Sequence, residues 1–293
     1  MIRRIQNVKL TLNRSLSRFL EEEARTRQGF GSFHSDDIEE MVMDPNFNLP
    51  PSLLEAEKRI ELDWCEHLKH LKLGRGYRGS AFVQTSDWTF LNHGAFGGAL
   101  LPMLQLSECW RRECESQPLL FFDRNLFPLM ARSIRLIARF FNCPADELYP
   151  LQNVTSGLNC VLNSIQLTSG DEVICFSLTY GSTKKMLTDL CARTGATLRI
   201  VHIPLPITSA ECILSSLSNT INENTKLVII DQITSNTAFL MPTLELASIA
   251  KQAGALVVVD AAHAMMSTHV QIYPENIAKT AIPSTLQGEY ELT

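Results

Sequence analysis

The sequence predicts an α/β protein, in which a mostly parallel sheet lies between two layers of helices and follows a helical N-terminal arm. From Leu148 onward, short strand-like segments alternate with segments of helical length, an order typical of a parallel sheet. The strand-like segments are continuous apolar runs, such as residues 257–259, as expected for strands buried on both faces. Asp260 comes where that last strand ends, and ligands of open α/β sheets bind at this end of the strands.

The composition is that of a soluble globular protein, and it gives no reason to expect nucleic acid or a membrane as a partner. Of the 293 residues, 45% are hydrophobic and 19% are charged, as in ordinary globular domains. The net charge of −5 gives no reason to expect nucleic acid as a partner. No apolar run approaches the roughly 20 residues of a membrane helix, so no membrane partner is predicted. His67 and His70 can share a helix face, but no further ligand cluster accompanies them, and no metal site is predicted.

The first 50 residues are predicted to be a basic segment and a linker. Residues 1–20 contain Arg and Lys but no Asp or Glu, together with Ser, Thr and aliphatic residues. This composition is typical of a mitochondrial transit peptide, and an ordinary basic amphipathic helix is the alternative. We expect a cytoplasmic protein, with mitochondrial targeting by residues 1–20 as the alternative. Residues 28–51 are rich in Gly, Ser, Asp, Asn and Pro, which indicates an irregular linker.

Helices are predicted before the sheet. Ser52 and Glu55 form a capping-box signature, and apolar residues then recur at helical spacing up to Leu71, so residues 51–86 are predicted to form a helical arm. Pro102 opens a further helix. The apolar stripe of another helix is Met130, Ile134, Ile137 and Phe141.

The elements of the sheet region follow in order within a predicted major domain of residues 87–264. Strands are predicted over residues 173–176, 197–203, 226–231 and up to Asp260. Helices are predicted from Thr155 through Leu167, over 182–193, around 209–221, and up to Ala253. Residues 265–293 are predicted to be a divergent C-terminal tail.

Polar residues stand where these strands end or where the next helices begin. Residues 153–157 place hydroxyl and N–H groups at a helix N-terminus, a geometry that binds phosphate. Tyr180, beyond the strand 173–176, can lay its ring on a planar cofactor. Residues 234–236 add polar groups after the strand that ends at Asp231.

Asp260 is the most informative of these polar residues. A carboxylate is costly to bury unless a cation meets it, and a protonated ring nitrogen of a cofactor such as pyridoxal 5′-phosphate (PLP) is one such cation. The alternative is that Asp260 caps the next segment and that His263 packs locally.

Four motifs of this sequence are similar to those of a known family: 91–97 (LNHGAFG), 153–157 (NVTSG), 231–235 (DQITS) and 259–264 (VDAAHA). Together they resemble the class V aminotransferases, PLP enzymes of fold type I, and within them the isopenicillin-N epimerase-like branch. The resemblance covers about residues 87–264. It implies that the major domain is a PLP-dependent transferase domain.

The resemblance also implies roles for individual residues. Thr155 and Ser156 would hold the cofactor phosphate, Tyr180 would stack on its ring, and Asp260 would pair with the pyridinium nitrogen. His263 would approach the phenolic oxygen or the substrate, and it is the one candidate catalytic residue. The edge of the ring would be bordered by Thr234, Ser235 and Asn236. The substrate side would be lined by Asn92, His93 and Gly94.

One departure from the family concerns the lysine that forms a Schiff base with PLP. After Ala264 the sequence leaves the family pattern, and Lys279 comes earlier than the family's lysine, with no familiar flanking residues. We therefore expect a chain truncated before the Schiff-base lysine, with a major domain incomplete at its C-terminus. Covalent attachment of PLP is not expected, and catalysis would be impaired.

The resemblance leaves the reaction open. Transamination, epimerisation and carbon–sulfur cleavage of an amino acid or amine all use this scaffold, so the fold does not choose between them. The alternative to a catalytically impaired enzyme is a non-catalytic isoform or a dimerisation partner of a full-length PLP enzyme. Because members of the family usually form dimers, a homodimer is expected.

Overall fold

The computed structural model describes residues 38–55, 58, 74, 81–83, 89–265 and 267. The chain divides into two compact units, one of Met1–Phe90 and Gly98–Ala131, the other of Leu91–Gly97 and Arg132–Thr293. The predicted targeting segment, most of the 51–86 arm and Lys279 lie outside the described residues, and the predicted domain boundaries stay a prediction. Where the structure describes the chain, no helix is both long and apolar enough to cross a membrane.

The described elements of the first unit are helical. They are α2 (Ile38–Met43), α6 (Leu101–Ser116), α7 (Pro118–Leu120), the π-helical turn η1 (Phe121–Asn125) and the start of α8 (Leu126–Phe140). Helix α6 begins where Pro102 predicts it, since a proline in the first turn removes no helical hydrogen bond. Helix α8 continues into the second unit, and its Ile134 is buried as predicted, whereas Ile137 is exposed.

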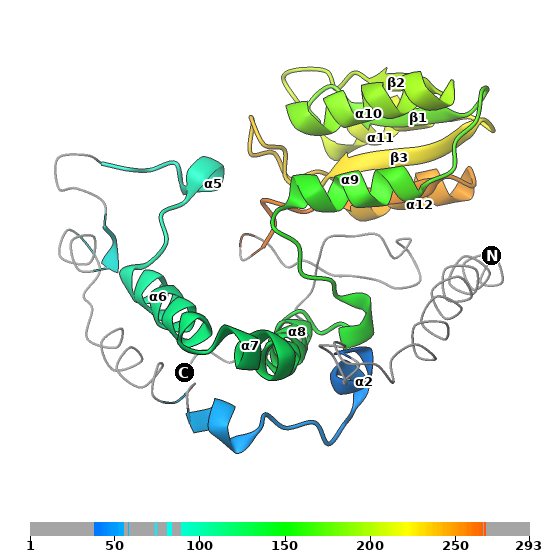
Figure 1. The fold of residues 1–293 in the computed structure, drawn as a ribbon. Helices are drawn as coiled ribbons and strands as arrows, with labels where there is room; N and C mark the ends of the chain where they lie inside the picture. The colour runs from blue at the N-terminus through cyan, green and yellow to red at the C-terminus, as the bar shows by residue number, and fades with distance from the viewer. Residues whose placement is uncertain are drawn as a thin grey trace, which may run out of the picture. The chain divides into compact units, whose positions relative to one another are not determined.

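A parallel sheet forms the centre of the second unit (Figure 1). Its described strands are β1 (Glu172–Phe176), β2 (Thr197–Val201), β3 (Thr225–Asp231) and β4 (Leu256–Asp260). They lie in the order β2-β1-β3-β4, and every pair is parallel. The continuous apolar runs explain this arrangement, because such strands bury side chains on both faces of the sheet.

Described helices cover both faces of the sheet (Figure 1). On one face, α9 (Val154–Ser164) and α10 (Gly181–Thr194) pack over a core that includes Leu158, Leu187 and Ile229. On the other face, α11 (Ala210–Ser218) and α12 (Thr243–Gln252) pack over a core that includes Ile213 and Leu246. The predicted three-layer α/β fold with a mostly parallel sheet is therefore confirmed.

The strand order reverses between β1 and β3. From β1 the chain winds outward to β2, and it then returns to place β3 and β4 on the other side of β1. In open α/β sheets, such a reversal leaves a crevice outside the carboxyl ends of the two strands, and ligands bind there. A ligand site is therefore expected at the carboxyl ends of β1 and β3.

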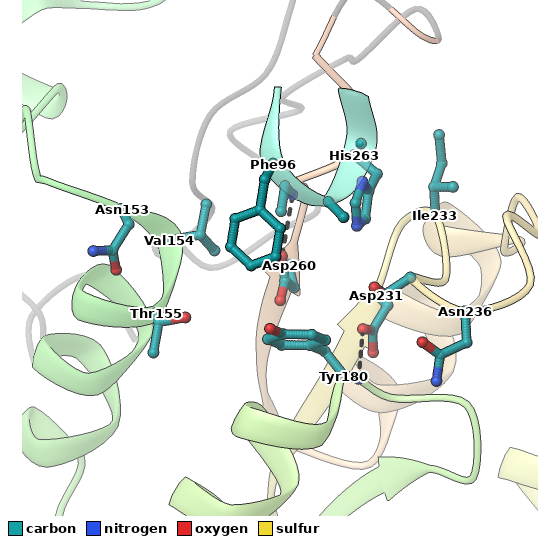
Figure 2. A pocket seen from close by; sticks show the side chains of 14 residues that line it. Phe96, Asn153, Val154, Thr155, Tyr180, Asp231, Ile233, Asn236, Asp260 and His263 are labelled. Carbon is teal, nitrogen blue, oxygen red and sulfur yellow. Dashed lines mark hydrogen bonds between the residues drawn. The ribbon is translucent and has the colours of Figure 1, made fainter. Parts of the chain in front are cut away.

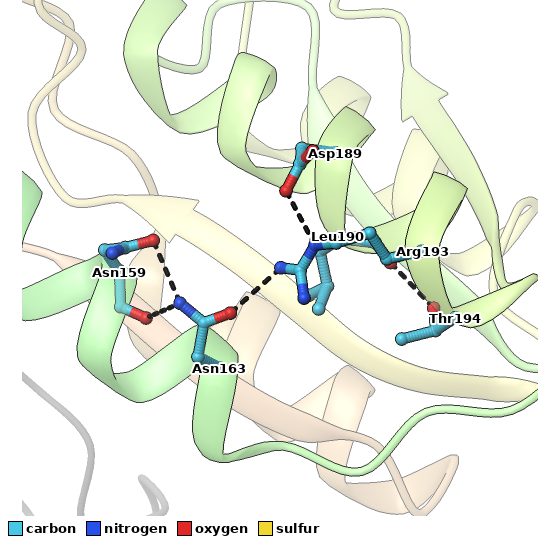
Figure 3. Close-up of polar contacts among 6 residues, drawn as sticks. All are labelled: Asn159, Asn163, Asp189, Leu190, Arg193 and Thr194. Carbon is cyan, nitrogen blue, oxygen red and sulfur yellow. Dashed lines mark hydrogen bonds and ion pairs between the residues drawn. The ribbon is translucent and has the colours of Figure 1, made fainter.

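Polar side chains join α9 to α10 on the surface of the same unit (Figure 3). The Arg193 guanidinium donates through Nε to Asp189 Oδ2 at 2.8 Å, and through Nη2 to Asn163 Oδ1 at 2.9 Å. Asn163 in turn donates to the carbonyl oxygen of Asn159 at 2.8 Å. Arg193 therefore links two helices that are 30 residues apart in sequence at this contact.

We expect a small coupling between Arg193 and Asn163. Because the Arg193 side chain is half-exposed, solvent screens the contact, and a coupling of about 0.5–1 kcal/mol is expected. A double-mutant cycle with Arg193→Ala and Asn163→Ala, followed by urea unfolding, measures it. The matched control is the exposed pair Arg112 and Glu108 within α6, for which a smaller coupling is expected. Equal couplings in both cycles would contradict a role in joining the helices.

Candidate functional site

A cavity of about 440 Å³ opens at the carboxyl ends of β1, β3 and β4 (Figure 2). Its volume lies in the range typical of small-molecule sites. Its lining residues come from the second unit only. They are Gly94, Ala95, Phe96, Asn153, Val154, Thr155, Tyr180, Asp231, Ile233, Ser235, Asn236, Asp260, Ala262 and His263.

The N-terminus of α9 forms one side of the cavity. Asn153 is its N-cap, and its Oδ1 accepts the N–H of Ser156 at 2.8 Å. This bond explains why the helix begins here, since Asn is among the preferred N-cap residues. The N–H groups of Val154 and Thr155 have no acceptor within the helix, and they stand at its positive end. An anion in the cavity would be stabilised by these groups and by the Thr155 hydroxyl.

Tyr180 stands at the start of α10, where its ring turns into the cavity (Figure 2). Its backbone N–H donates to Asp231 Oδ1 at 3.0 Å. This bond crosses from the segment after β1 to the end of β3, the two strands between which the sheet order reverses. Tyr180 is 42% exposed, so its ring is available to a planar ligand.

Two buried carboxylates face the cavity from adjacent strands. Asp231 and Asp260 are register partners at the ends of β3 and β4, and only 4% and 6% of their surfaces are exposed. Burial raises the pKa of the Asp260 carboxyl, while the hydrogen bond from the Ala262 N–H and the charge of His263 lower it. Burial also raises the pKa of Asp231, against hydrogen bonds from Thr179 and Tyr180. A cationic group in the cavity would compensate for the burial of these charges.

The short helix α5 (His93–Phe96) lies against His263. A Cβ atom at Gly94 would stand 3.9 Å from two atoms of the His263 ring, which is ordinary contact. At Gly97 a Cβ would stand only 3.0 Å from the backbone oxygen of His93, so a side chain here would crowd the end of α5. Phe96 lines the cavity although its side chain is 88% exposed.

The loop between β3 and α12 turns back on itself through Thr234. Ile233 and Leu240 form an antiparallel bridge, and the Thr234 hydroxyl accepts the N–H of Phe239 at 2.9 Å. The same hydroxyl contacts that of Thr237 at 2.6 Å. Because these bonds occupy the buried Thr234 side chain, its neighbours at the tip of the loop face the cavity instead.

The cavity thus gathers most of the predicted site residues, which are Gly94, Thr155, Tyr180, Ser235, Asn236, Asp260 and His263. Four others do not line it: Asn92, His93, Ser156 and Thr234. Asn92 precedes α5, His93 is exposed on it, and the backbone N–H of Ser156 bonds to the helix cap. Asp231 was missed as a lining residue, although it stands at a strand end just as Asp260 does. No group of three or more His, Cys, Asp or Glu within the described ranges could hold a metal ion.

Comparison with known proteins adds relatives that match part of this chain. L-cysteine desulfhydrase of Arabidopsis thaliana is 29% identical over 197 residues, which cover 62% of this chain and 43% of the relative. Isopenicillin N epimerase of Amycolatopsis lactamdurans is 25% identical over 179 residues, which cover 60% of this chain and 45% of the relative. The chain thus spans less than half the length of these curated relatives.

Solved structures share the fold. The cystine C–S lyase C-DES, in complex with its reaction product cysteine persulfide, matches with a TM-score of 0.55 and 20% identity. The match covers 63% of this chain and 52% of that one. At this identity the likeness supports the fold alone, and it agrees with the three-layer arrangement described above.

The family assignment comes from a family model. The model of the class-V aminotransferases matches residues 127–277, a stretch that includes three of the four motifs and all four described strands. The resemblance predicted from those motifs is confirmed. Because the match extends over more than half of the 293 residues, this chain belongs to the class-V aminotransferase family.

Proposed function

We propose that this chain binds PLP in the cavity at the strand ends and that it serves carbon–sulfur chemistry on a cysteine-like amino acid. The observation that carries the proposal is the buried Asp260 carboxylate, which faces the same cavity as a helix N-terminus and an aromatic ring. Such a carboxylate is costly to bury without a cation. A ligand with a protonated ring nitrogen supplies that cation.

The donor set fits the three parts of PLP. The N–H groups at the start of α9 and the Thr155 hydroxyl would hold the phosphate, as helix N-termini commonly do. Tyr180 would cover the aromatic ring. Asp260 would hold the proton on the ring nitrogen, because an ionised carboxylate stabilises a neighbouring cation.

When bound, PLP acts as an electron sink for a bond broken at the α-carbon of the substrate. His263 lies in the same lining and can give or take a proton at either ring nitrogen. Ile233 and Phe96 place apolar surface at the cavity. His263 is therefore the proposed proton-transfer residue.

The proposed substrate class rests on two observations. The relatives include L-cysteine desulfhydrases, and a solved structure of the same fold is a cystine C–S lyase. The side chains at Gly94, Ala95 and Ala262 are small or absent, which suits an amino acid with a short side chain. Sulfur-containing amino acids are thus favoured over large aromatic ones.

A second candidate function is ligand binding without turnover. None of the described residues that line the cavity is a lysine, so nothing in this lining can hold the aldehyde of PLP covalently. The 293-residue chain would then bind the cofactor non-covalently, as a non-catalytic isoform or partner of a longer PLP enzyme. Dimer formation and the cellular location stay predictions, which sedimentation and a reporter fused to residues 1–20 can test.

Reduction with borohydride distinguishes catalysis through covalently held PLP from ligand binding without turnover. We expect the purified chain to bind pyridoxamine 5′-phosphate, which has no aldehyde, and to show no specific pyridoxyl label after PLP and borohydride are added. If no lysine joins the described lining of the cavity, turnover of cysteine to sulfide is expected to be about 10²–10⁴-fold slower than in a family enzyme with a positioned lysine. Peptide mapping and a sulfide assay measure both outcomes.

Lys279→Ala is the control for this experiment, because surface lysines also react with aldehydes. A label confined to Lys279, together with cysteine breakdown that is lost in Lys279→Ala, would show covalent catalysis and contradict non-covalent binding. Failure of the chain to bind pyridoxamine 5′-phosphate would contradict the cofactor site itself.

A further inference from the structure

Asp231 joins the end of β3 to the start of α10. Its Oδ1 accepts the backbone N–H of Tyr180 at 3.0 Å, although the two residues are 51 positions apart. The carboxylate also accepts a hydrogen bond from the side chain of Thr179. Hydrogen bonds within strands and helices do not make this connection, because Tyr180 precedes α10 and Asp231 is the last residue of β3.

Thr179 lies inside a tight turn between β1 and α10. Its N–H donates to the Phe176 oxygen at 3.0 Å, and its Oγ1 accepts the Phe176 N–H at 3.2 Å. The Thr179 hydroxyl therefore keeps its own proton for Asp231. Since Thr179 is 4% exposed, loss of the acceptor would leave a buried donor without a partner.

The direction of the Tyr180 ring depends on this turn. The ring extends into the cavity, and Tyr180 is 42% exposed as a residue, so packing alone fixes the ring weakly. The backbone at position 180 sets where the ring begins, and that backbone is bonded to Asp231 (Figure 2). Asp260 holds a different contact, because its Oδ1 accepts the Ala262 N–H in its own loop.

We infer that Asp231 is a positioning residue of the cofactor site, whose carboxylate fixes the backbone of Tyr180 and so places the ring that covers the cofactor. The inference rests on the proposed PLP site. The two acids at the strand ends then have different roles. Asp260 meets the ligand itself, whereas Asp231 holds the aromatic residue that contacts the ligand from the side of α10.

The test is a double-mutant cycle on the affinity of the full chain for pyridoxamine 5′-phosphate, measured by calorimetry. Asp231→Ala and Tyr180→Ala are each expected to weaken binding about tenfold, the effect of losing one aromatic contact. The double variant is expected to bind no more weakly than Tyr180→Ala, because Asp231 acts through that ring. Asp231→Asn keeps the acceptor and is expected to bind within about threefold of wild type.

Three outcomes would overturn the inference. Losses that multiply to about a hundredfold in the double variant would show that Asp231 acts independently of Tyr180. Wild-type affinity in Asp231→Ala would show that it has no role, and an Asn variant as weak as the Ala variant would assign the effect to charge. If Asp231→Ala does not fold, Asp231→Ser takes its place, since the shorter side chain retains polarity but cannot reach Tyr180. A wild-type chain that binds no pyridoxamine 5′-phosphate would instead defeat the proposed function.

Discussion

Asp260→Asn is expected to weaken cofactor binding and, at the same time, to stabilise the chain without ligand. The substitution keeps an oxygen that accepts the Ala262 N–H, but it removes the charge that would meet a protonated ring nitrogen. A hydrogen bond to a charged partner contributes about 1.5–3 kcal/mol. The affinity for pyridoxamine 5′-phosphate is therefore expected to fall by about 10- to 100-fold.

The stabilisation follows from the pKa of Asp260. Burial raises this pKa in the folded state above its value in the unfolded chain, so the folded state binds the proton more tightly. The free energy of unfolding then falls as the pH rises from the ordinary carboxyl pKa through the raised one. At neutral pH the ionised side chain costs stability, and asparagine removes that cost.

Urea unfolding at pH 4.5 and at pH 7.5 checks the second half of this expectation. The difference between variant and wild type should be largest at pH 7.5 and should shrink as the pH falls through the raised pKa of Asp260. Asp146→Asn is the control, because Asp146 is exposed in the turn η2 (Ala145–Glu147). Unchanged affinity would show that Asp260 does not face a cationic ligand, and a less stable Asp260→Asn at pH 7.5 would show that burial of the ionised Asp260 is not costly.

Leu158→Ala is expected to cost about 2–5 kcal/mol of stability, the range for a buried leucine reduced to alanine. Leu158 lies on α9, is 1% exposed, and packs into the core between α9, α10 and the sheet. A loss of this size is a large part of the stability of an ordinary domain. Urea unfolding followed by circular dichroism measures it.

Ligand should offset part of this loss. Pyridoxamine 5′-phosphate at about 100 times its dissociation constant is expected to return about 2.7 kcal/mol, because it binds only the folded state. Leu151→Ala is the matched control, since Leu151 is 55% exposed, and a change within about 0.5 kcal/mol is expected there. Equal losses at both positions would mean that the α9 face is not a packed core.

The fold could be predicted because its strands are distinct in the sequence. Ile174, Val228 and Val258 lie in continuous apolar runs, and each is at most 1% exposed. The strand ends were harder to predict, as β2 shows. It was predicted to run to residue 203 but ends at Val201, because the Ile203 N–H turns to the Ser177 hydroxyl at 3.1 Å instead of to a strand neighbour.

The site residues could be predicted where their place after a strand or at the start of a helix is enough to bring them to the cavity. Asp260, Tyr180 and Thr155 follow strands or open helices, and parallel strands bring such positions to one edge. The choice between Thr234 and Ser235 depends on hydrogen bonds within their loop, which the pattern of residue types does not reveal. The bond between Tyr180 and Asp231 joins residues 51 positions apart, so no local period indicates it.

Two glycines with positive φ lie just before strands, at the end of the sheet opposite the cavity. Gly195 and Gly254 have φ values of 78° and 81°, and each lets the chain turn from a helix into the next strand, where other residues would be strained. The residues that face the cavity lie at the carboxyl ends of β3 and β4, in the segments that follow the strands, and in α5 and the first turn of α9. Changes in the segments that follow the strands can therefore alter what the cavity binds while the strands and their glycine turns stay the same, which allows one scaffold to diversify into enzymes with different reactions.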